Sequence, residues 1–283
     1  MEYFSLLRKA ALAEAKKNFA KAYNIYSEAL KYSKYSKTTL KIMSKMAWCQ
    51  YQVGNKLEAE ELFTKISTLY PDEPFGIQFY ADFLIKTDRH KAAKNLLSKA
   101  ISKFPDQLEL YLTLASLLKS IDRSVEAIGI LKSALTAENL TIGRTIRRKD
   151  MWAELGSLYY DRGDYNSSIA CLKKSMRMGN EEEFYHYDLL ASCYLKINDP
   201  ENALKFIDAH IRIYGEQDSA DYILKARAHA RLEQLPQAAS CILRAYAFDN
   251  CLALRLDEMA DFSVLIKKGF FQTLDNVEFE STS

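Results

Sequence analysis

The residues of this chain best suited to metal binding or nucleophilic catalysis are its histidines and cysteines, and their spacing supports neither chemistry. The histidines are His90, His186, His210 and His229, and the cysteines are Cys49, Cys171, Cys193, Cys241 and Cys251. No two histidines form an HxxxH or HExxH pair, and none lies at ligand spacing from a cysteine. The odd cysteine count without a CxxC pair favours a reducing compartment over a disulfide framework. We therefore expect no metal and no other cofactor.

The glycines form no motif for phosphate binding or acyl transfer. The chain has no GxGxxG or GxxxxGK[ST] loop, whose backbone N–H groups would hold a phosphate. It also has no GxSxG turn, which presents the nucleophilic serine of many hydrolases. The acidic run at 181–183 stands where a helix is expected to begin, and negative charge is favourable there. The sequence thus predicts a protein that is not an enzyme.

The secondary structure of the chain is predicted to be helical. Gly and Pro number only 9 and 5 among 283 residues, too few for the turns of an all-β fold. The formal net charge of +2 argues against nucleic-acid binding. No apolar stretch approaches the ~20 residues of a membrane span, and the N-terminus does not resemble a signal peptide. We expect a cytoplasmic protein with no membrane insertion.

Small residues recur at two positions with a spacing of 34 to 41 residues. The first set is Ala10, Ala47, Ala81, Ala115, Gly156, Ala191 and Ala226. The second set is Ala22, Ala59, Ala93, Ala127, Ser168, Ala203 and Ala238. Small residues where helices touch allow their backbones to approach closely. The pattern therefore predicts seven helix pairs, each packed on its neighbours.

Two segments carry a family resemblance. Residues 152–165, with Trp152, Leu155, Gly156 and Tyr159, resemble the first helix and turn of a tetratricopeptide repeat (TPR), and residues 54–71 resemble the second helix. The chain is similar to the TPR family over about residues 3–252. This resemblance implies an all-α, right-handed superhelical solenoid of about seven helix pairs with C-terminal capping helices. The expected parts are repeats one to four at 3–139, an irregular basic junction at 140–148, repeats five to seven at 149–252, a cap at 253–275 and a disordered tail at 276–283.

The resemblance also implies a binding groove. In this family, positions 2, 5, 9 and 12 of each first helix point into the concave surface and contact a protein or peptide partner. The residues so placed include Lys41, Ser44, Trp48, Tyr51, Phe75, Gln78, Asp82, Glu109, Lys119, Tyr160, Tyr185 and Asp188. Exposed aromatic residues often dominate binding energy, so Trp48 and Tyr51 are expected anchors, unless they pack against the neighbouring helix.

The function predicted is a non-enzymatic scaffold or adaptor for a protein or peptide partner. A self-associating structural subunit, such as a homodimer, and a regulatory sensor of a small signalling peptide are the alternatives. Some co-chaperones of the family hold a heat-shock Glu-Glu-Val-Asp tail with Lys and Asn at positions 5 and 9 of successive first helices. This chain has other residues at those positions, so no such tail is expected as its ligand. The basic stretch Arg144, Arg147, Arg148 and Lys149 is either a solvated loop or a docking point for an acidic or phosphorylated segment.

Overall fold

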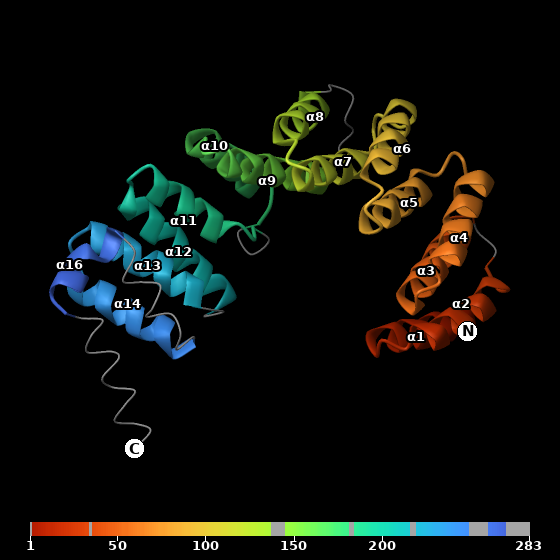
Figure 1. The fold of residues 1–283 in the computed structure, drawn as a ribbon, viewed down its shortest axis with the longest axis horizontal. Helices are drawn as coiled ribbons and strands as arrows, with labels where there is room; N and C mark the ends of the chain where they lie inside the picture. The colour runs from red at the N-terminus through yellow and green to blue at the C-terminus, as the bar shows by residue number, and fades with distance from the viewer. Residues whose placement is uncertain are drawn as a thin grey trace, which may run out of the picture. The chain divides into compact units, whose positions relative to one another are not determined.

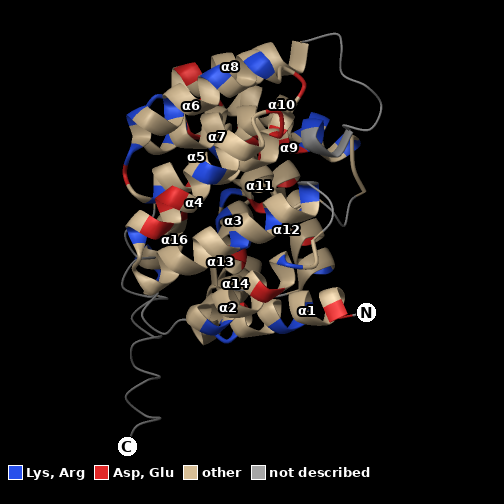
Figure 2. Ribbon diagram, turned by 90° about the vertical axis from the view of Figure 1, so that its right-hand side faces the viewer, with Lys and Arg blue, Asp and Glu red and all other residues tan. Residues whose placement is uncertain are grey.

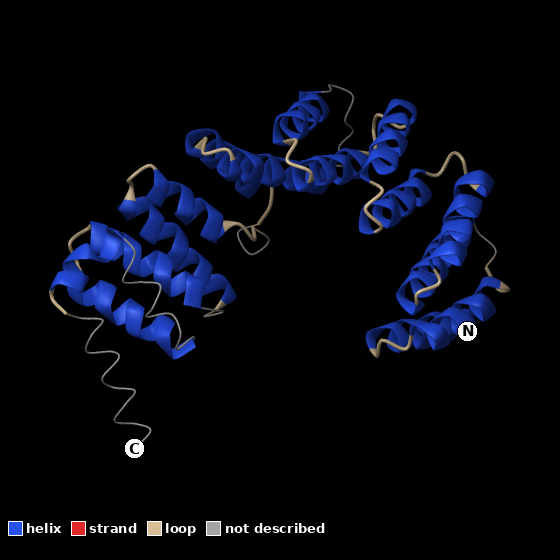
Figure 3. Cartoon of the chain, viewed as in Figure 1, coloured by secondary structure: helices blue, strands red, loops and turns tan. Residues whose placement is uncertain are grey.

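The computed structural model consists of helices joined by turns, without a strand in the part of the chain it describes (Figure 3). Described are residues 2–33, 36–136, 145–180, 184–215, 219–248 and 260–269. The chain divides into two compact units, Met1–Thr141 and Ile142–Ser283, which we call the N-terminal and C-terminal units. The division falls within the stretch 140–148 that the sequence marks as irregular. The predicted all-α fold is confirmed, and each unit is described by itself.

The N-terminal unit contains four helix pairs (Figure 1). The pairs are α1 (Glu2–Ala15) with α2 (Phe19–Leu30), α3 (Ser36–Val53) with α4 (Lys56–Leu69), α5 (Pro74–Lys86) with α6 (His90–Lys103), and α7 (Leu108–Ser120) with α8 (Ser124–Thr136). Successive pairs also touch, because α2 packs on α3, α4 on α5 and α6 on α7. The helices α2 to α7 therefore each bury one face against their partner, and successive pairs pack on one another through α2 and α3, α4 and α5, and α6 and α7.

The C-terminal unit contains three further pairs and a short closing segment. The pairs are α9 (Thr145–Asp161) with α10 (Tyr165–Arg177), α11 (Tyr187–Lys196) with α12 (Pro200–Tyr214), and α13 (Ser219–Arg231) with α14 (Leu235–Phe248). The closing segment is the 3-10 helix η4 (Ala260–Phe262) and α16 (Ser263–Lys267). Phe262 and Leu265 are buried in one cluster with Tyr222 of α13 and Ile242 of α14. The expected tail at 276–283 lies outside the described residues.

The fourteen small residues form the helix contacts that the repeat requires. All are buried, and every one except Gly156 has 0 % exposure. Gly156 and Ser168 are the two that are not alanine, and they touch each other. The Ser168 hydroxyl donates to the Gly156 carbonyl at 2.7 Å, and a Cβ added to Gly156 would lie 2.7 Å from Leu172 Cγ. Close backbone packing therefore explains the period.

Each of the seven pairs turns through one residue with positive φ. These residues are Lys17, Gly54, Asp88, Asp122, Gly163, Asn198 and Glu233, with φ between 57° and 103°. The second helix begins two residues later in every pair. In three turns the intervening residue, Asn18, Asp164 or Asp199, accepts a hydrogen bond from the backbone N–H three residues on, which caps the helix.

Candidate interaction surface

Trp48 and Tyr51 of α3, the expected groove anchors, belong to an aromatic cluster between neighbouring helices. The Trp48 ring centroid lies 5.5 Å from that of Tyr51 and 5.8 Å from that of Phe63 on α4. Tyr51 lies 5.6 Å from Phe83 on α5, and its hydroxyl donates to the Lys86 carbonyl at 3.3 Å. Both rings are partly buried. They pack against the neighbouring helices and leave only part of their surface free.

Ser44 of α3 is completely buried, which contradicts the expectation that it faces a groove. The reason is that α3 is covered from two sides. Ile42 and Met46 pack in the cluster formed with α1 and α2, whereas Met43 and Ala47 pack in the cluster formed with α4 and α5. The free face of α3 is therefore narrower than the position rule assumes, and it excludes Ser44.

Asp82 of α5 is the expected groove residue whose titration is most altered by the fold. Burial raises the pKa of its carboxyl from 3.8 to about 6, against the opposing effect of Lys86 one turn later. Gln78 on α5 and both Glu109 and Lys119 on α7 are partly exposed. A poorly solvated carboxylate on an accessible face would interact favourably with a cationic group of a partner.

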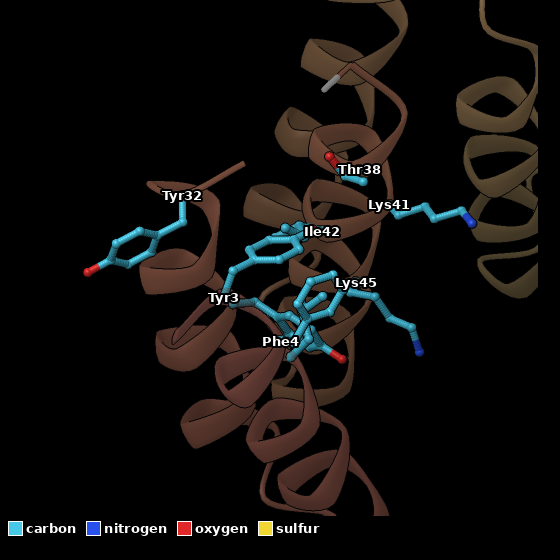
Figure 4. A pocket seen from close by; sticks show the side chains of 9 residues that line it. Tyr3, Phe4, Tyr32, Thr38, Lys41, Ile42 and Lys45 are labelled. Atoms are coloured by element: carbon cyan, nitrogen blue, oxygen red, sulfur yellow. The ribbon is translucent and has the colours of Figure 1, made fainter. Parts of the chain in front are cut away.

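An apolar pocket of about 600 Å³ opens between α1, the end of α2 and α3 (Figure 4). It is lined by Tyr3, Phe4, Leu7, Tyr26, Tyr32, Thr38, Lys41, Ile42 and Lys45. Phe4 is 74 % exposed and Tyr32 is 44 % exposed. Figure 4 shows the ends of the Lys41 and Lys45 side chains pointing away from the rings, so the wall is apolar and the rim is basic. Large apolar side chains left exposed beside a cavity are a common feature of binding sites.

A second pocket, of about 350 Å³, adjoins the first at Lys41. It is lined by Lys37, Leu40, Lys41, Glu73, Pro74, Phe75 and Gln107. Lys41 lines both pockets, and its Nζ lies 5.7 Å from the ring centroid of Phe75. Phe75 is 38 % exposed and packs edge-to-face on Phe79 at 4.6 Å. We call the two pockets together the α1–α5 surface; of the expected groove residues, Lys41 and Phe75 belong to it.

The aromatic residues Tyr3, Phe4 and Tyr32 were not among the expected site residues. The expected groove residues all come from repeats two to six, so none lies in repeat one. Phe4 and Leu7 nevertheless occupy positions 2 and 5 of the first helix in repeat one. Applying the same position rule to that repeat would have placed both at the site.

The remaining expected groove residues lie in the C-terminal unit. Tyr160 packs edge-to-face on Tyr165 at 5.6 Å, and burial raises the pKa of its hydroxyl. Tyr185 is 68 % exposed and stacks on Tyr214 at 5.7 Å. Asp188 is partly exposed in the first turn of α11. An open aromatic face at Tyr185 is therefore available within this unit.

The basic stretch is only partly described. Arg144 and the side chain of Arg147 lie outside the described residues, whereas Arg148 and Lys149 belong to α9. The Lys149 carbonyl accepts a hydrogen bond from Ser175 at 2.9 Å, and its side chain packs so closely on Gly179 that an added Cβ would lie 2.7 Å from it. From residue 145 onward this stretch is helical, and Lys149 packs against the end of α10.

The cysteines of the described ranges lie inside the helix pairs. Cys49, Cys171, Cys193 and Cys241 are buried free thiols. Across these ranges no three His, Cys, Asp or Glu side chains meet as a metal site. None of the helices described combines the length and apolar character needed to cross a bilayer.

The paired helices and the buried small positions define a TPR solenoid. The chain belongs to the ChAPs family (Chs5p-Arf1p-binding proteins), whose family model matches residues 51–246. No curated sequence relative matches it.

Solved structures of TPR proteins share this fold at low sequence identity. The pilF protein of Pseudomonas aeruginosa is 16 % identical with a TM-score of 0.63, covering 83 % of this chain and 100 % of its own. The C-terminal part of a TPR protein from Cytophaga hutchinsonii is 16 % identical with a TM-score of 0.60, covering 86 % and 95 %. YrrB, described as a TPR protein with an unusual peptide-binding site, is 16 % identical with a TM-score of 0.55, covering 70 % and 98 %.

Proposed function

We propose that this chain is a non-enzymatic scaffold that binds a segment of a partner protein along the α1–α5 surface. The observation that carries this proposal is the exposed ring of Phe4 beside an open apolar pocket. Fully burying an exposed Phe side chain contributes about 1.5–3 kcal/mol. Phe4 is 74 % exposed and Phe75 is 38 % exposed, so the two rings together would supply part of the ~8 kcal/mol of a micromolar affinity. The fold class supports a protein as the ligand.

The partner proposed has an apolar segment flanked by acidic residues. Lys37, Lys41 and Lys45 line the two pockets, and Glu73 is the one carboxylate among their lining residues. Lys45 Nζ already pairs with Glu14 at 3.1 Å, so Lys37 and Lys41 supply the positive charge of the rim. Such a basic rim would speed association with an acidic partner and fix its orientation more than it would add affinity. The family name gives Chs5p and Arf1p as proteins bound by its members. Proteins of these two kinds are therefore the first candidates for this chain.

Binding of the purified chain to purified Chs5p-type and Arf1p-type proteins, followed by biolayer interferometry, tests the proposal. Phe4→Ala combined with Phe75→Ala should weaken binding about 30-fold or more, because removing a single interface anchor costs about 2 kcal/mol. Leu57→Ala with Val125→Ala is the matched control. It removes side chains that are 77 % and 65 % exposed on the second helices α4 and α8, outside the α1–α5 surface, and should change binding less than about two-fold.

Circular dichroism of both double variants verifies that the fold is retained. Equal binding by the two double variants would exclude the α1–α5 surface. Absence of binding to either candidate by the unchanged chain would exclude Chs5p-type and Arf1p-type partners.

We also propose that the free edges of Trp48 and Tyr51, with Gln78 and Asp82, extend this surface. The chain has two tryptophans, so Trp152→Phe leaves Trp48 as a single emission probe. Partner binding should shift Trp48 emission to shorter wavelength because the ring loses water. An unchanged spectrum at saturating partner would limit the interface to the two pockets.

A further inference from the structure

A pocket of a different kind lies in the C-terminal unit, between α10 and α12. Its volume is about 470 Å³, and four basic side chains line it. Lys173 and Arg177 are four residues apart on α10, so they share a helix face. Lys205 and Arg212 are seven residues apart on α12, close to two full turns, and share a face in the same way. Lys and Arg are spread over helices of both units (Figure 2). This pocket differs in that four basic side chains, from two helices, line one cavity.

Three of the four cations of this pocket, Lys173, Arg177 and Lys205, are not balanced by a carboxylate within the described part of the chain. Asp208 is the one carboxylate among the lining residues, and its Oδ1 already pairs with Lys225 Nζ at 2.6 Å. Lys173, Arg177 and Lys205 form no ion pair with any carboxylate in the described ranges. Like charges that converge in this way repel one another, and a bound anion would relieve that repulsion.

Aromatic rings hold two of the ammonium groups in place. Lys173 Nζ lies 6.0 Å and Lys205 Nζ lies 5.9 Å from the ring centroid of Phe206. Lys173 Nζ also lies 5.2 Å from the ring centroid of Tyr194. These cation–π contacts restrict the two long side chains before any ligand binds, which lowers the entropy cost of binding.

We propose that this pocket binds a phosphorylated, acidic segment of a partner protein. A phosphate group carries about two negative charges and three strong acceptor oxygens, and guanidinium groups such as that of Arg177 bind it through paired hydrogen bonds. The three unpaired cations Lys173, Arg177 and Lys205 exceed the charge of a single phosphate, so acidic residues flanking the phosphate are needed. Met176 and Phe206 add apolar lining that an inorganic anion would not use. The inference rests on the proposed protein-binding function but concerns a separate set of residues.

Fluorescence anisotropy on the full chain tests this site. The probe is a fluorescein-labelled peptide with a central phosphoserine flanked by Asp and Glu, compared with its unphosphorylated twin. The phosphopeptide should bind at least ten-fold more tightly, and its affinity should fall as salt rises. Lys173→Met with Lys205→Met should weaken its binding at least ten-fold. Methionine keeps the apolar stems that cover Phe206 while it removes both charges.

Lys174→Met with Lys196→Met is the matched control. It also removes two positive charges, one from α10 and one from α11, but neither residue lines the pocket. This control should change the phosphopeptide affinity less than about two-fold. Equal binding of the two peptides, or equal effects of the two double variants, would overturn the proposal. So would binding of inorganic pyrophosphate as tight as that of the phosphopeptide, which would indicate a general small-anion site. Binding to phosphatidylserine vesicles without peptide binding would assign the cations to a membrane surface instead.

The α1–α5 variant separates this proposal from the proposed function. Phe4→Ala with Phe75→Ala changes no residue of the basic pocket, so phosphopeptide affinity should remain within about two-fold. Loss of phosphopeptide binding in that variant would overturn the assignment of the ligand to α10 and α12. If the unchanged chain binds the phosphopeptide but neither candidate partner, the phosphopeptide site is supported and the Chs5p-type and Arf1p-type proteins are excluded as partners.

Discussion

Replacing Asp82 by Asn should stabilise the protein at neutral pH and leave its stability almost unchanged near pH 4. Burial raises the pKa of the Asp82 carboxyl to about 6, against an ordinary value of 3.8, and Lys86 only partly opposes this rise. The folded protein therefore binds this proton more tightly than the unfolded chain. Stability from this group is complete below pH 4, falls as pH rises toward 6 and stays low above it.

The size of the effect follows from the shift. One pKa unit corresponds to about 1.4 kcal/mol, so a rise from 3.8 to about 6 corresponds to at most about 3 kcal/mol. The carboxyl keeps some contact with water, which screens the effect, so we expect about 2 kcal/mol. Asparagine keeps the shape of the side chain without the charge. The Asp82→Asn variant should therefore exceed the unchanged chain by about 2 kcal/mol at pH 7.5.

Urea unfolding at pH 4 and pH 7.5, followed by circular dichroism, measures this difference. Glu61→Gln on α4 is the control, because it removes an exposed carboxylate from the same unit. Its effect should stay within about 0.5 kcal/mol at both pH values. An equal shift in stability at both pH values, or destabilisation by Asp82→Asn at pH 7.5, would show that the buried carboxylate does not destabilise the folded protein.

Three further changes test packing and burial. Gly156→Ala should cost about 1–2 kcal/mol in urea unfolding because its Cβ would lie 2.7 Å from buried Leu172, whereas Gly129→Ala, with open space around it, should gain about 0.5 kcal/mol. Phe262→Ala should cost about 3 kcal/mol and speed amide exchange in η4 and α16, because the ring is fully buried. Cys49 should resist iodoacetamide at pH 8 until urea is added, because burial and Glu14 raise the pKa of its thiol to about 12.

These expectations have clear contrary outcomes. Equal effects of the two glycine substitutions would mean that Leu172 moves aside freely. Val264→Ala is the control for Phe262→Ala, because Val264 lies in the same closing segment but is 47 % exposed. An equal loss of stability in both variants would show that burial of Phe262 does not stabilise the closing segment. Alkylation of native Cys49 at the rate of free glutathione would show that the thiol is accessible and ionised.

The helix pairs could be predicted from the sequence because one physical demand recurs in every pair. Neighbouring helices touch at two positions that admit only small residues, and those positions can be read off a single chain. Ile66 marks the limit of this approach, because it stands where the family normally has a small residue. It is fully buried, and room for it comes from Gly76, where a Cβ would lie 2.7 Å from Ile66 Cγ2. That compensation lies in the next helix pair, so no single repeat reveals it.

The site was less predictable because exposure depends on what covers a helix. The position rule named Lys41 and Phe75, which line the proposed α1–α5 surface, but it could not show that two neighbours of α3 bury Ser44. The basic pocket was missed for a different reason. Its cations, such as Lys173 and Lys205, are far apart in sequence and converge only when α10 and α12 are placed in space. A search for runs of like charge finds the stretch at 144–149 and passes over them.

A repeat fold separates the residues that hold it together from those that can bind. The buried small residues tolerate little increase in size. At Gly156, for example, even an added Cβ would lie 2.7 Å from Leu172. Phe4 on a first helix and Lys205 on a second helix are exposed and do not lie at the small-residue contacts between helices, so their chemistry can vary while the stacking remains. The chain accordingly carries an apolar surface on α1–α5 and a basic pocket on α10 and α12. A partner with both an apolar and a phosphorylated segment would gain effective concentration from binding the two, whereas two partners would be held on one chain. In both cases the buried small residues maintain the fold, and the exposed residues determine which partner binds.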